Sequence, residues 1–298
     1  MHFASEIYRP PYEADIDEFL QVTSGCSHNA CAFCPLYRSA KFRVSPREEI
    51  VEDLKELQDY KLHYGAQFSR IFLQGADAFV LSYEKLMEIR ELIREYLPDI
   101  ENIGGYARVD NVKNKTVEQL RSLKEAGFQD FFFGIETGDE SLLKRMNKGY
   151  DSNEFVVEQM SKLDEAGMTW TAAFLGGLGG HGYGFKHADE TAKLLNRLHP
   201  MIIFSTELTL MPHTKLYEDV KTGAYVEADE KERLLEIQEL IRKIEIKTFF
   251  WGAHTTIPIP ILGKLPDEKE KLVNQIERVL ETADFEALKR HRANIRQL

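Results

Sequence analysis

Cysteine is scarce in this chain of 298 residues: there are three, and all of them lie between Cys26 and Cys34. An odd number of thiols in so short a segment makes a poor disulfide framework. The same group suits metal binding, because thiolates that lie close together along the chain can share one site. No other cysteine in the sequence is left to complete such a site.

The sequence also lacks the segments that bring proteins to membranes or nucleic acids. It has no apolar run long enough to cross a bilayer, and residues 1–15 contain acids and a proline pair but no apolar signal-peptide centre. The formal net charge is −11 without a basic stripe, and such a surface repels phosphate backbones. We therefore expect a cytoplasmic protein with neither a membrane nor a nucleic acid as partner.

Strand-like and helix-like segments alternate along most of the chain. Six apolar, strand-like segments occupy residues 19–23, 70–73, 100–107, 128–135, 168–175 and 201–210. Amphipathic helical segments separate them, and this alternation is typical of βαβ units with a parallel sheet. The sequence therefore predicts an α/β fold, a partial (β/α)6 TIM-like barrel core over residues 1–220. Residues 221–298, with helices expected at 230–247 and 267–281, are predicted to form a C-terminal helical extension packed on the barrel.

The three cysteines directly follow the first expected strand. In a parallel α/β barrel this position lies on the C-terminal face, where active sites are built. Cys26, Cys31 and Cys34 can bind three irons of a four-iron cluster, and the fourth iron then stays open to a substrate or cofactor. The alternative is a zinc site formed by the same cysteines together with His28 or another histidine.

The cysteine triad, with the aromatic Phe33 just before the last cysteine, resembles the radical SAM superfamily. The resemblance covers roughly residues 8–220 and includes the stretch 8–12, Tyr-Arg-Pro-Pro-Tyr, and the Cys-Ser-His-Asn run. One spacing departs from the commonest family pattern, because four residues separate Cys26 from Cys31 where three are usual.

This resemblance implies a 4Fe-4S cluster and S-adenosylmethionine (SAM) as cofactors. The open iron would bind the amino and carboxylate groups of SAM, and an external one-electron donor such as flavodoxin or ferredoxin would reduce the cluster. Reductive cleavage would give a 5′-deoxyadenosyl radical that abstracts hydrogen from a small-molecule substrate, while the protein orients the reactants and excludes water. The resemblance thus implies an enzyme with radical chemistry of the oxidoreductase or lyase type.

Family motifs for SAM also fall on the ends of the second and third expected strands. Gln74, Gly75, Ala76 and Asp77 match the family turn whose backbone receives the methionine amino group, with aspartate in place of glutamate. Such a turn is also ordinary loop chemistry, since glycine serves any close backbone approach. Arg108 could clamp the methionine carboxylate, or it could pair with Asp110.

The fourth and fifth expected strands end in further matches. Glu136 and Thr137 match the family pair that holds the SAM ribose, and the alternative is an acid that caps the following helix. Gly176, Gly177 and Leu178 match the flat backbone that the family runs along the adenine, and the alternative is a flexible loop. Phe33 is expected beside the same cofactor.

Substrate-side candidates are fewer. Residues 211–217 resemble a segment of coproporphyrinogen-oxidase-like members, with His213 in place of a glycine, and a histidine there could move a substrate proton. A structural turn is the alternative reading of that segment. Tyr37 is a second catalytic candidate, and Trp251 and His254 are further side chains that could face the substrate.

Features that are missing from the sequence limit the kinds of reaction that are expected. Three cysteines leave none for a second cluster, no cobalamin-binding domain is expected before the barrel, and the acidic surface disfavours tRNA modification. A small molecule is therefore the expected substrate, with a tetrapyrrole-related compound as one subset. The competing function is a non-catalytic zinc or iron–sulfur metalloprotein that binds a ligand or transfers electrons. A conventional SAM methyltransferase would need a glycine-rich first loop in place of the cysteines.

Overall fold

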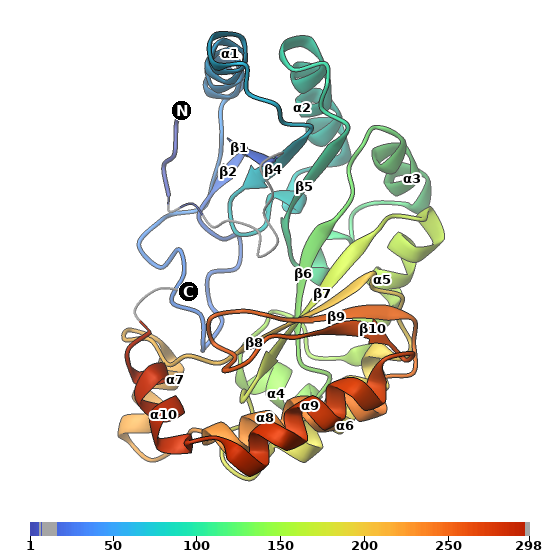
Figure 1. Cartoon of the computed structure of the whole chain (residues 1–298). Helices are drawn as coiled ribbons and strands as arrows, with labels where there is room; N and C mark the ends of the chain where they lie inside the picture. Colours follow the sequence, from blue (N-terminus) through green and yellow to red (C-terminus); the bar gives the residue numbers. More distant parts are fainter. Residues whose placement is uncertain (6, 8–16, 296–298) are drawn as a thin grey trace. The chain divides into compact units, whose positions relative to one another are not determined.

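The computed structural model describes residues 1–5, 7 and 17–295 (Figure 1). The chain divides into two compact units. The first unit comprises Met1–Asn29, Leu36–Gly134 and Gln159–Trp170, and the second comprises Ala30–Pro35, Ile135–Glu158 and Thr171–Leu298. The stretch 8–12, which carries part of the family resemblance, lies outside the described residues.

Eight strands form one sheet in the order β1-β4-β5-β6-β7-β8-β9-β10. The strands of this sheet lie side by side in the order in which they occur along the chain, and the pairings β1–β4, β4–β5, β5–β6, β7–β8 and β8–β9 are all parallel. The strands are β1 (Asp17–Gln21), β4 (Arg70–Gln74), β5 (Asn102–Ala107), β6 (Phe131–Glu136), β7 (Trp170–Gly176), β8 (Ile202–Glu207), β9 (Thr248–Gly252) and β10 (Ile261–Leu265). The expected α/β class with a mostly parallel sheet is confirmed.

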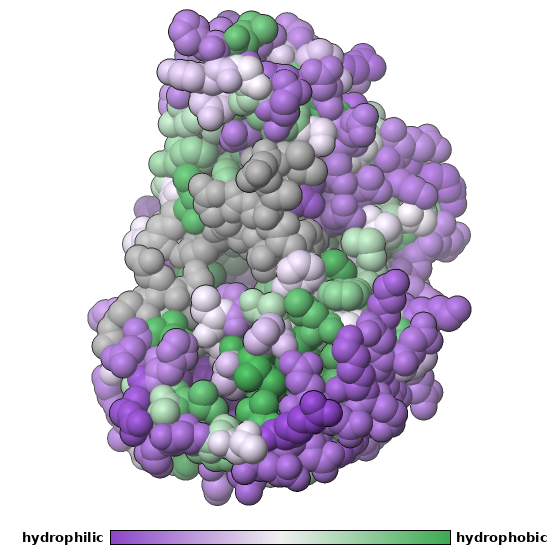
Figure 2. All heavy atoms as spheres, in the orientation of Figure 1, coloured by the Kyte–Doolittle hydropathy of each residue, from purple (hydrophilic) through white to green (hydrophobic). Residues whose placement is uncertain are grey.

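Helices follow most of these strands, as parallel connections require. They are α1 (Arg47–Tyr64), α2 (Tyr83–Tyr96), α3 (Val117–Glu125), α4 (Glu140–Arg145), α5 (Asn153–Ala166), α6 (Gly184–Leu195), α7 (Lys215–Lys221), α8 (Glu230–Lys243), α9 (Lys269–Thr282) and α10 (Phe285–Ala293), with short turns of 3-10 helix η1 (Ala78–Val80) and η2 (Val109–Asn111). The local sequence determines where helices begin: Asp229 and Glu232, for example, form a reciprocal capping box at the beginning of α8. Hydrophilic side chains cover much of the helical surface seen in Figure 2. None of the helices within the described ranges combines the length and apolarity needed to span a bilayer.

The C-terminal part of the chain contains two strands that the sequence analysis does not predict. β9 pairs in parallel with β8, and β10 returns antiparallel to β9, so both extend the sheet of the second unit (Figure 1). The segment Thr-Phe-Phe-Trp-Gly of β9 is rich in residues that favour strands. The alternating burial along β10 fits a strand with one covered face.

A short antiparallel pair frames the segment that carries the cysteines. β2 (Thr23–Ser24) pairs with β3 (Arg43–Val44). The chain therefore leaves the end of β1, passes through the cysteine loop (residues 25–34) and returns beside its own starting point. This closes the base of the loop within the first unit.

Aromatic packing holds the strands of the first unit. Phe72, Tyr106 and Phe132 lie on neighbouring strands, with ring centroids 5.1 to 6.4 Å apart. Phe131 points to the opposite face, because side chains alternate along a strand, and its ring lies 4.6 Å from that of Phe79. Both faces of β6 are thus filled, and its carboxyl end is carried on a rigid core.

The first unit also buries a lysine just before α3. Lys115 donates to the carbonyls of Phe79 (2.8 Å) and Asn111 (3.1 Å), and only 3% of its side chain is exposed. Burial lowers the pKa of Lys115 to about 8, and the negative charge of Glu84 opposes only part of this shift. The ammonium group therefore ties two short helical turns together at a cost in desolvation.

We predict that this lysine makes the stability of the protein depend on alkaline pH. Between pH 8 and 10.5 the unfolded chain binds more protons at Lys115 than the folded chain, so the free energy of unfolding rises with pH. Between pH 8 and 10.5 the free energy of unfolding of the wild type should rise by about 3 kcal/mol more than that of Lys115→Met. Urea denaturation at several pH values measures this difference. The exposed neighbour Lys113→Met is the control, and equal pH profiles for wild type and Lys115→Met would contradict the prediction.

Candidate active site

The turn after β4 holds the first part of the cysteine loop. Ala76 donates its backbone N–H to the carbonyl of Gly25 (3.1 Å), and Asp77 Oδ1 accepts the backbone N–H of Ser27 (3.1 Å). Asp77 Oδ2 accepts the hydroxyl of Ser27. The backbone on both sides of Cys26 is therefore fixed by the turn in which the sequence predicts SAM contacts.

Gly75 lies in this turn with a φ of 113°, a conformation that favours glycine. A Cβ at this position would lie 1.9 Å from Thr23 Oγ1, and that hydroxyl donates to the carbonyl of Gln74 (3.4 Å). The turn and the base of the cysteine loop thus approach so closely that no side chain fits between them. A binding role for the Gly75 backbone stays a prediction.

Charges around Cys26 are buried. Burial raises the pKa of the Asp77 carboxyl, although hydrogen bonds from Ser27 oppose the rise. Burial, and then the charge of Asp77, raise the pKa of the Cys26 thiol. Binding of iron must therefore displace a proton that the folded protein holds firmly.

Arg108, at the end of β5, forms the ion pair that the sequence left as one of two possibilities. Its Nε lies 3.0 Å from Asp110 Oδ1, and a terminal nitrogen lies 3.3 Å from Oδ2 of the same carboxylate. The positive charge of Arg108 also acts on Cys26 and Asp77, where it partly opposes the rise in pKa that burial causes. A carboxylate clamp on SAM by Arg108 stays a prediction.

Two other segments hold the second part of the cysteine loop, within the second unit. Ala32 donates its N–H to the carbonyl of Met146 (2.8 Å), and its own carbonyl accepts the N–H of Leu216 (2.9 Å). The side-chain amide of Asn147 donates to the carbonyl of Ala30 (3.0 Å). These bonds fix the backbone on both sides of Cys31. Ala32 and Met146 also belong to one apolar cluster with Leu178, Leu208 and Leu216.

The turn after α4 also contains a lysine, Lys148, that contacts Glu136, the predicted ribose ligand. Lys148 Nζ lies 3.2 Å from Glu136 Oε1, and only 4% of the lysine side chain is exposed. Lys148 Nζ lies 5.9 Å from the ring centroid of Phe33 in the cysteine loop. Glu136 ends β6 with a φ of 65°, unusual for a residue other than glycine. Strain of this kind is often found at functional sites.

The remaining cofactor candidates lie nearby in the second unit. Thr137 is fully buried, and its hydroxyl accepts the backbone N–H of Asp139, so it shapes the turn that starts α4. Gly176 is the last residue of β7, and the N–H of the following Gly177 donates to Glu236 Oε2 (3.1 Å). Leu178 is fully buried in the apolar cluster that includes Ala32. Leu178, which follows the two glycines, and Ala32 of the cysteine loop therefore pack in the same apolar cluster.

The substrate-side candidates fall in different settings. His213 is exposed and has a φ of 68° in the turn before α7, where the Thr214 hydroxyl caps the helix. Tyr37 is buried, and its carbonyl accepts the amide of Asn29 (3.1 Å). His254 follows β9, with Nδ1 2.9 Å from Thr256 Oγ1, and burial lowers its pKa.

The cysteines carry thiols rather than disulfides, and thiolates are the donors that hold iron–sulfur clusters. Cys26 belongs to the first unit, and Cys31 and Cys34 belong to the second. Among the described side chains, no three His, Cys, Asp or Glu gather as ligands of a single metal ion. The donor set fits a cluster, and the joint binding of one cluster by all three thiolates stays a prediction.

Residues 20–195 match a family model described as the Radical SAM superfamily, which is well over half of the chain. The chain belongs to the radical SAM superfamily. The resemblance drawn from the cysteine triad is thereby confirmed. Membership implies a 4Fe-4S cluster and SAM and supports the general SAM-cleaving radical mechanism, without specifying the reaction of this member.

Curated relatives of this radical SAM protein are distant. An uncharacterized protein of Methanocaldococcus jannaschii is 24% identical over 77% of this chain and 70% of that protein. A haem chaperone of Buchnera aphidicola is 26% identical over 45% of this chain and 37% of the chaperone. A tRNA-2-methylthio-N(6)-dimethylallyladenosine synthase of Pelotomaculum thermopropionicum is 26% identical over 46% of this chain and 30% of the synthase. The chain therefore spans well under two thirds of the length of the last two.

Solved structures share the fold of this radical SAM protein at low identity. Methylornithine synthase has a TM-score of 0.52 and 17% identity, covering 91% of this chain and 85% of its own. Coproporphyrinogen III oxidase of Escherichia coli has a TM-score of 0.53 and 16% identity, covering 75% of this chain and 51% of its own. These likenesses show the fold alone, and they confirm the expected partial TIM-like barrel class.

We predict that Asp77 is needed to keep the cysteine loop ordered in this radical SAM protein. Asp77→Ala removes the acceptor for two groups of Ser27 and should lower the free energy of unfolding by about 1–3 kcal/mol. The variant should also retain less iron after reconstitution. Urea denaturation of the cluster-free protein and iron analysis measure the two effects.

The control for Asp77→Ala is Asp99→Ala, which removes an exposed carboxylate paired with Lys61 in the same unit. It should change stability by less than about 1 kcal/mol and leave the iron content unchanged. Wild-type iron content and stability in Asp77→Ala would show that the loop does not depend on this carboxylate.

Proposed function

We propose that this chain is an enzyme that reductively cleaves SAM at a 4Fe-4S cluster held by Cys26, Cys31 and Cys34 and applies the resulting radical to a small molecule. One observation carries the proposal. In the turn after α4, Met146 and Asn147 form hydrogen bonds with the cysteine loop. The next residue, Lys148, pairs with Glu136 at the end of β6. The loop of thiols and the carboxylate suited to a ribose are therefore built on one element, which a structural zinc site would not need.

The residues of the chain would divide the work of binding. When bound, the cluster would supply one electron to break a carbon–sulfur bond of SAM, with the cofactor's amino and carboxylate groups on the open iron. Glu136 would accept the two ribose hydroxyls, and residues 176–178 would lie along the adenine. The backbone of residues 74–77 would receive the methionine amino group, and Arg108 would neutralise its carboxylate.

Proton transfer to or from the substrate would fall to side chains beyond the cofactor. His213 and Tyr37 are the proposed catalytic residues. His254 is a further side chain that could face the substrate, and burial lowers its pKa, which favours the neutral imidazole that can accept a proton. The acidic chain, with a net charge of −11, favours a small-molecule substrate over a nucleic acid. Membership of the superfamily supports an external one-electron donor such as flavodoxin or ferredoxin.

A second candidate is non-catalytic binding of a tetrapyrrole. Two curated relatives, from Buchnera aphidicola and Bacillus subtilis, are named haem chaperones, at 26% and 25% identity over less than half of this chain. In that case the cluster would serve binding or electron transfer. Titration with haem and with coproporphyrinogen separates the candidates, because only an enzyme consumes SAM in their presence.

We predict SAM cleavage by the wild type and none by Cys34→Ala. After anaerobic reconstitution with iron and sulfide, the wild type reduced with dithionite should convert SAM to 5′-deoxyadenosine. Cys34→Ala loses one of three iron ligands, so product should fall to the background of the assay. Product is quantified by chromatography. A colourless wild-type protein that holds zinc and forms no product would refute the proposal.

A further inference from the structure

The glycine loop (residues 176–182) begins at the last residue of β7 and is anchored at several points by a later segment of the second unit, residues 225–236. The Gly177 N–H donates to Glu236 Oε2 (3.1 Å), and the Gly177 carbonyl accepts the Tyr225 hydroxyl (2.7 Å). Further along, His181 donates its N–H to the carbonyl of Val226 (2.8 Å). Both polar groups of the Gly177 backbone are thus used within the protein.

The far end of the loop is anchored in the same way. Gly182 donates its N–H to Glu232 Oε1 (2.8 Å), and the ring of His181 lies 3.0 Å from Glu232 Oε2. Glu232 also closes the capping box of α8 with Asp229. The position of the loop is therefore coupled to the first turn of α8.

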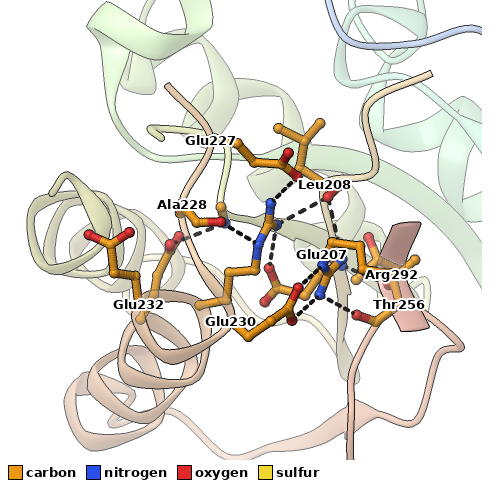
Figure 3. A network of polar contacts seen from close by, with 12 residues as sticks. Glu207, Leu208, Glu227, Ala228, Glu230, Glu232, Thr256 and Arg292 are labelled. Atoms are coloured by element: carbon orange, nitrogen blue, oxygen red, sulfur yellow. Dashed lines mark hydrogen bonds and ion pairs between the residues drawn. The ribbon is translucent and has the colours of Figure 1, made fainter. Parts of the chain in front are cut away.

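A buried ion pair lies beneath the start of the loop. Arg233 Nη1 lies 3.1 Å from Glu207 Oε2, and both side chains are at most 1% exposed. The same guanidinium reaches Glu227 (2.7 Å) and the carbonyls of Leu208 and Ala228, as the dashed contacts around Glu207 and Glu227 in Figure 3 show. All three nitrogens of the Arg233 guanidinium therefore donate to an acceptor.

The ion pair accounts for the glycines at positions 176 and 177, the last residue of β7 and the residue after it. A Cβ at Gly176 would lie 2.3 Å from Glu207 Oε1, and a Cβ at Gly177 would lie 2.3 Å from Arg233 Nη1. The charged groups fill the space that side chains would need. A side chain at either glycine would have to displace Glu207 of β8 or Arg233 of α8, so the ion pair fixes the position of the backbone at the start of the loop.

Three further contacts tie this network to its surroundings. Glu236 Oε1 lies 2.6 Å from Nδ1 of the fully buried His187 on α6. Arg292 of α10 pairs with Glu230 (2.5 Å) and donates to the carbonyl of Thr256 (2.9 Å), as Figure 3 shows. Helices α6, α8 and α10 all contribute to the anchoring.

We propose that Tyr225, Arg233 and Glu236 are positioning residues for the adenosine half of SAM, an inference that rests on the proposed function. Glu236 and Tyr225 bind the N–H and the carbonyl of Gly177, so the later segment fixes the course of the backbone that is proposed to lie along the adenine. A backbone held in one position before the ligand arrives suits the planar face of a purine. The segment 225–236 would thus position the backbone that contacts the adenine without touching the cofactor itself. Loss of its bonds to Gly177 would weaken the binding of SAM.

The test compares SAM with methionine as probes on the reconstituted full-length protein. Tyr225→Phe removes one hydroxyl and keeps the ring, and Glu236→Leu removes the acceptor for Gly177. Glu236→Gln keeps an acceptor and is the conservative variant, and Glu239→Leu, which removes a carboxylate paired with Lys243, is the control on α8. Dissociation constants come from calorimetry, and the electron paramagnetic resonance of the reduced cluster reports methionine binding.

We expect Tyr225→Phe to weaken SAM binding roughly threefold to tenfold and Glu236→Leu at least as much. Glu236→Gln and Glu239→Leu should stay near the wild type. Methionine should perturb the cluster spectrum equally in all variants, because it carries no adenosine. Hydrogen exchange of residues 176–182 should be faster in Tyr225→Phe and Glu236→Leu, a readout independent of the cluster.

Three outcomes would overturn the inference. Wild-type SAM affinity in a folded Tyr225→Phe or Glu236→Leu would show that the anchoring is not used for binding. An equal loss of methionine and SAM binding would place the effect at the cluster instead of at the adenosine. A wild-type protein that binds no SAM would overturn the proposed function and this inference together. If Glu236→Leu does not fold, Tyr225→Phe alone decides.

Discussion

The hydrogen bonds to the backbone next to the cysteines are the constraint on which the candidate site depends. The cysteine loop has no regular secondary structure of its own, so its backbone groups must find partners elsewhere. Ser27 finds Asp77 in the first unit, and Ala32 finds Met146 and Leu216 in the second. Each partner lies on a turn that begins or ends a helix or strand. The thiols are therefore held by rigid elements rather than by the loop itself, which reduces the entropy that a bound group would have to pay.

A similar logic explains why the second unit buries charge. A loop with glycine at positions 176, 177, 179, 180 and 182 loses much conformational entropy when it is ordered. Neutral packing could not hold it, because glycine offers no side chain to pack. Charged and hydroxyl groups can hold it, since they bind the backbone directly. The cost is desolvation, visible in the raised pKa of Glu207, where burial outweighs the nearby Arg233.

The sequence predicted those parts of the structure that depend on local pattern. Apolar runs located the strands β4 to β8, and the parallel arrangement then placed Gly75, Arg108 and Glu136 at strand ends. Partners from distant parts of the chain were not predictable in the same way. Lys148 lies 12 residues from Glu136, whereas Tyr225 and Glu236 lie 48 and 59 residues from Gly177. Lys148 could have been suspected from its place in the Met-Asn-Lys-Gly run, but nothing local distinguishes Glu236 from the other acids of a charged helix.

The place of the anchoring residues along the chain has a consequence for the family. The match to the radical SAM model ends at residue 195, and residues 225–236 lie beyond it. The glycine loop lies inside the matched region, yet its backbone geometry is set by contacts with the later segment. Shared motifs can therefore be preserved while the affinity for the cofactor is tuned by residues that the motifs do not include. Because each such contact acts through backbone position, modest changes in α8 would alter cofactor binding without altering any residue that touches the cofactor.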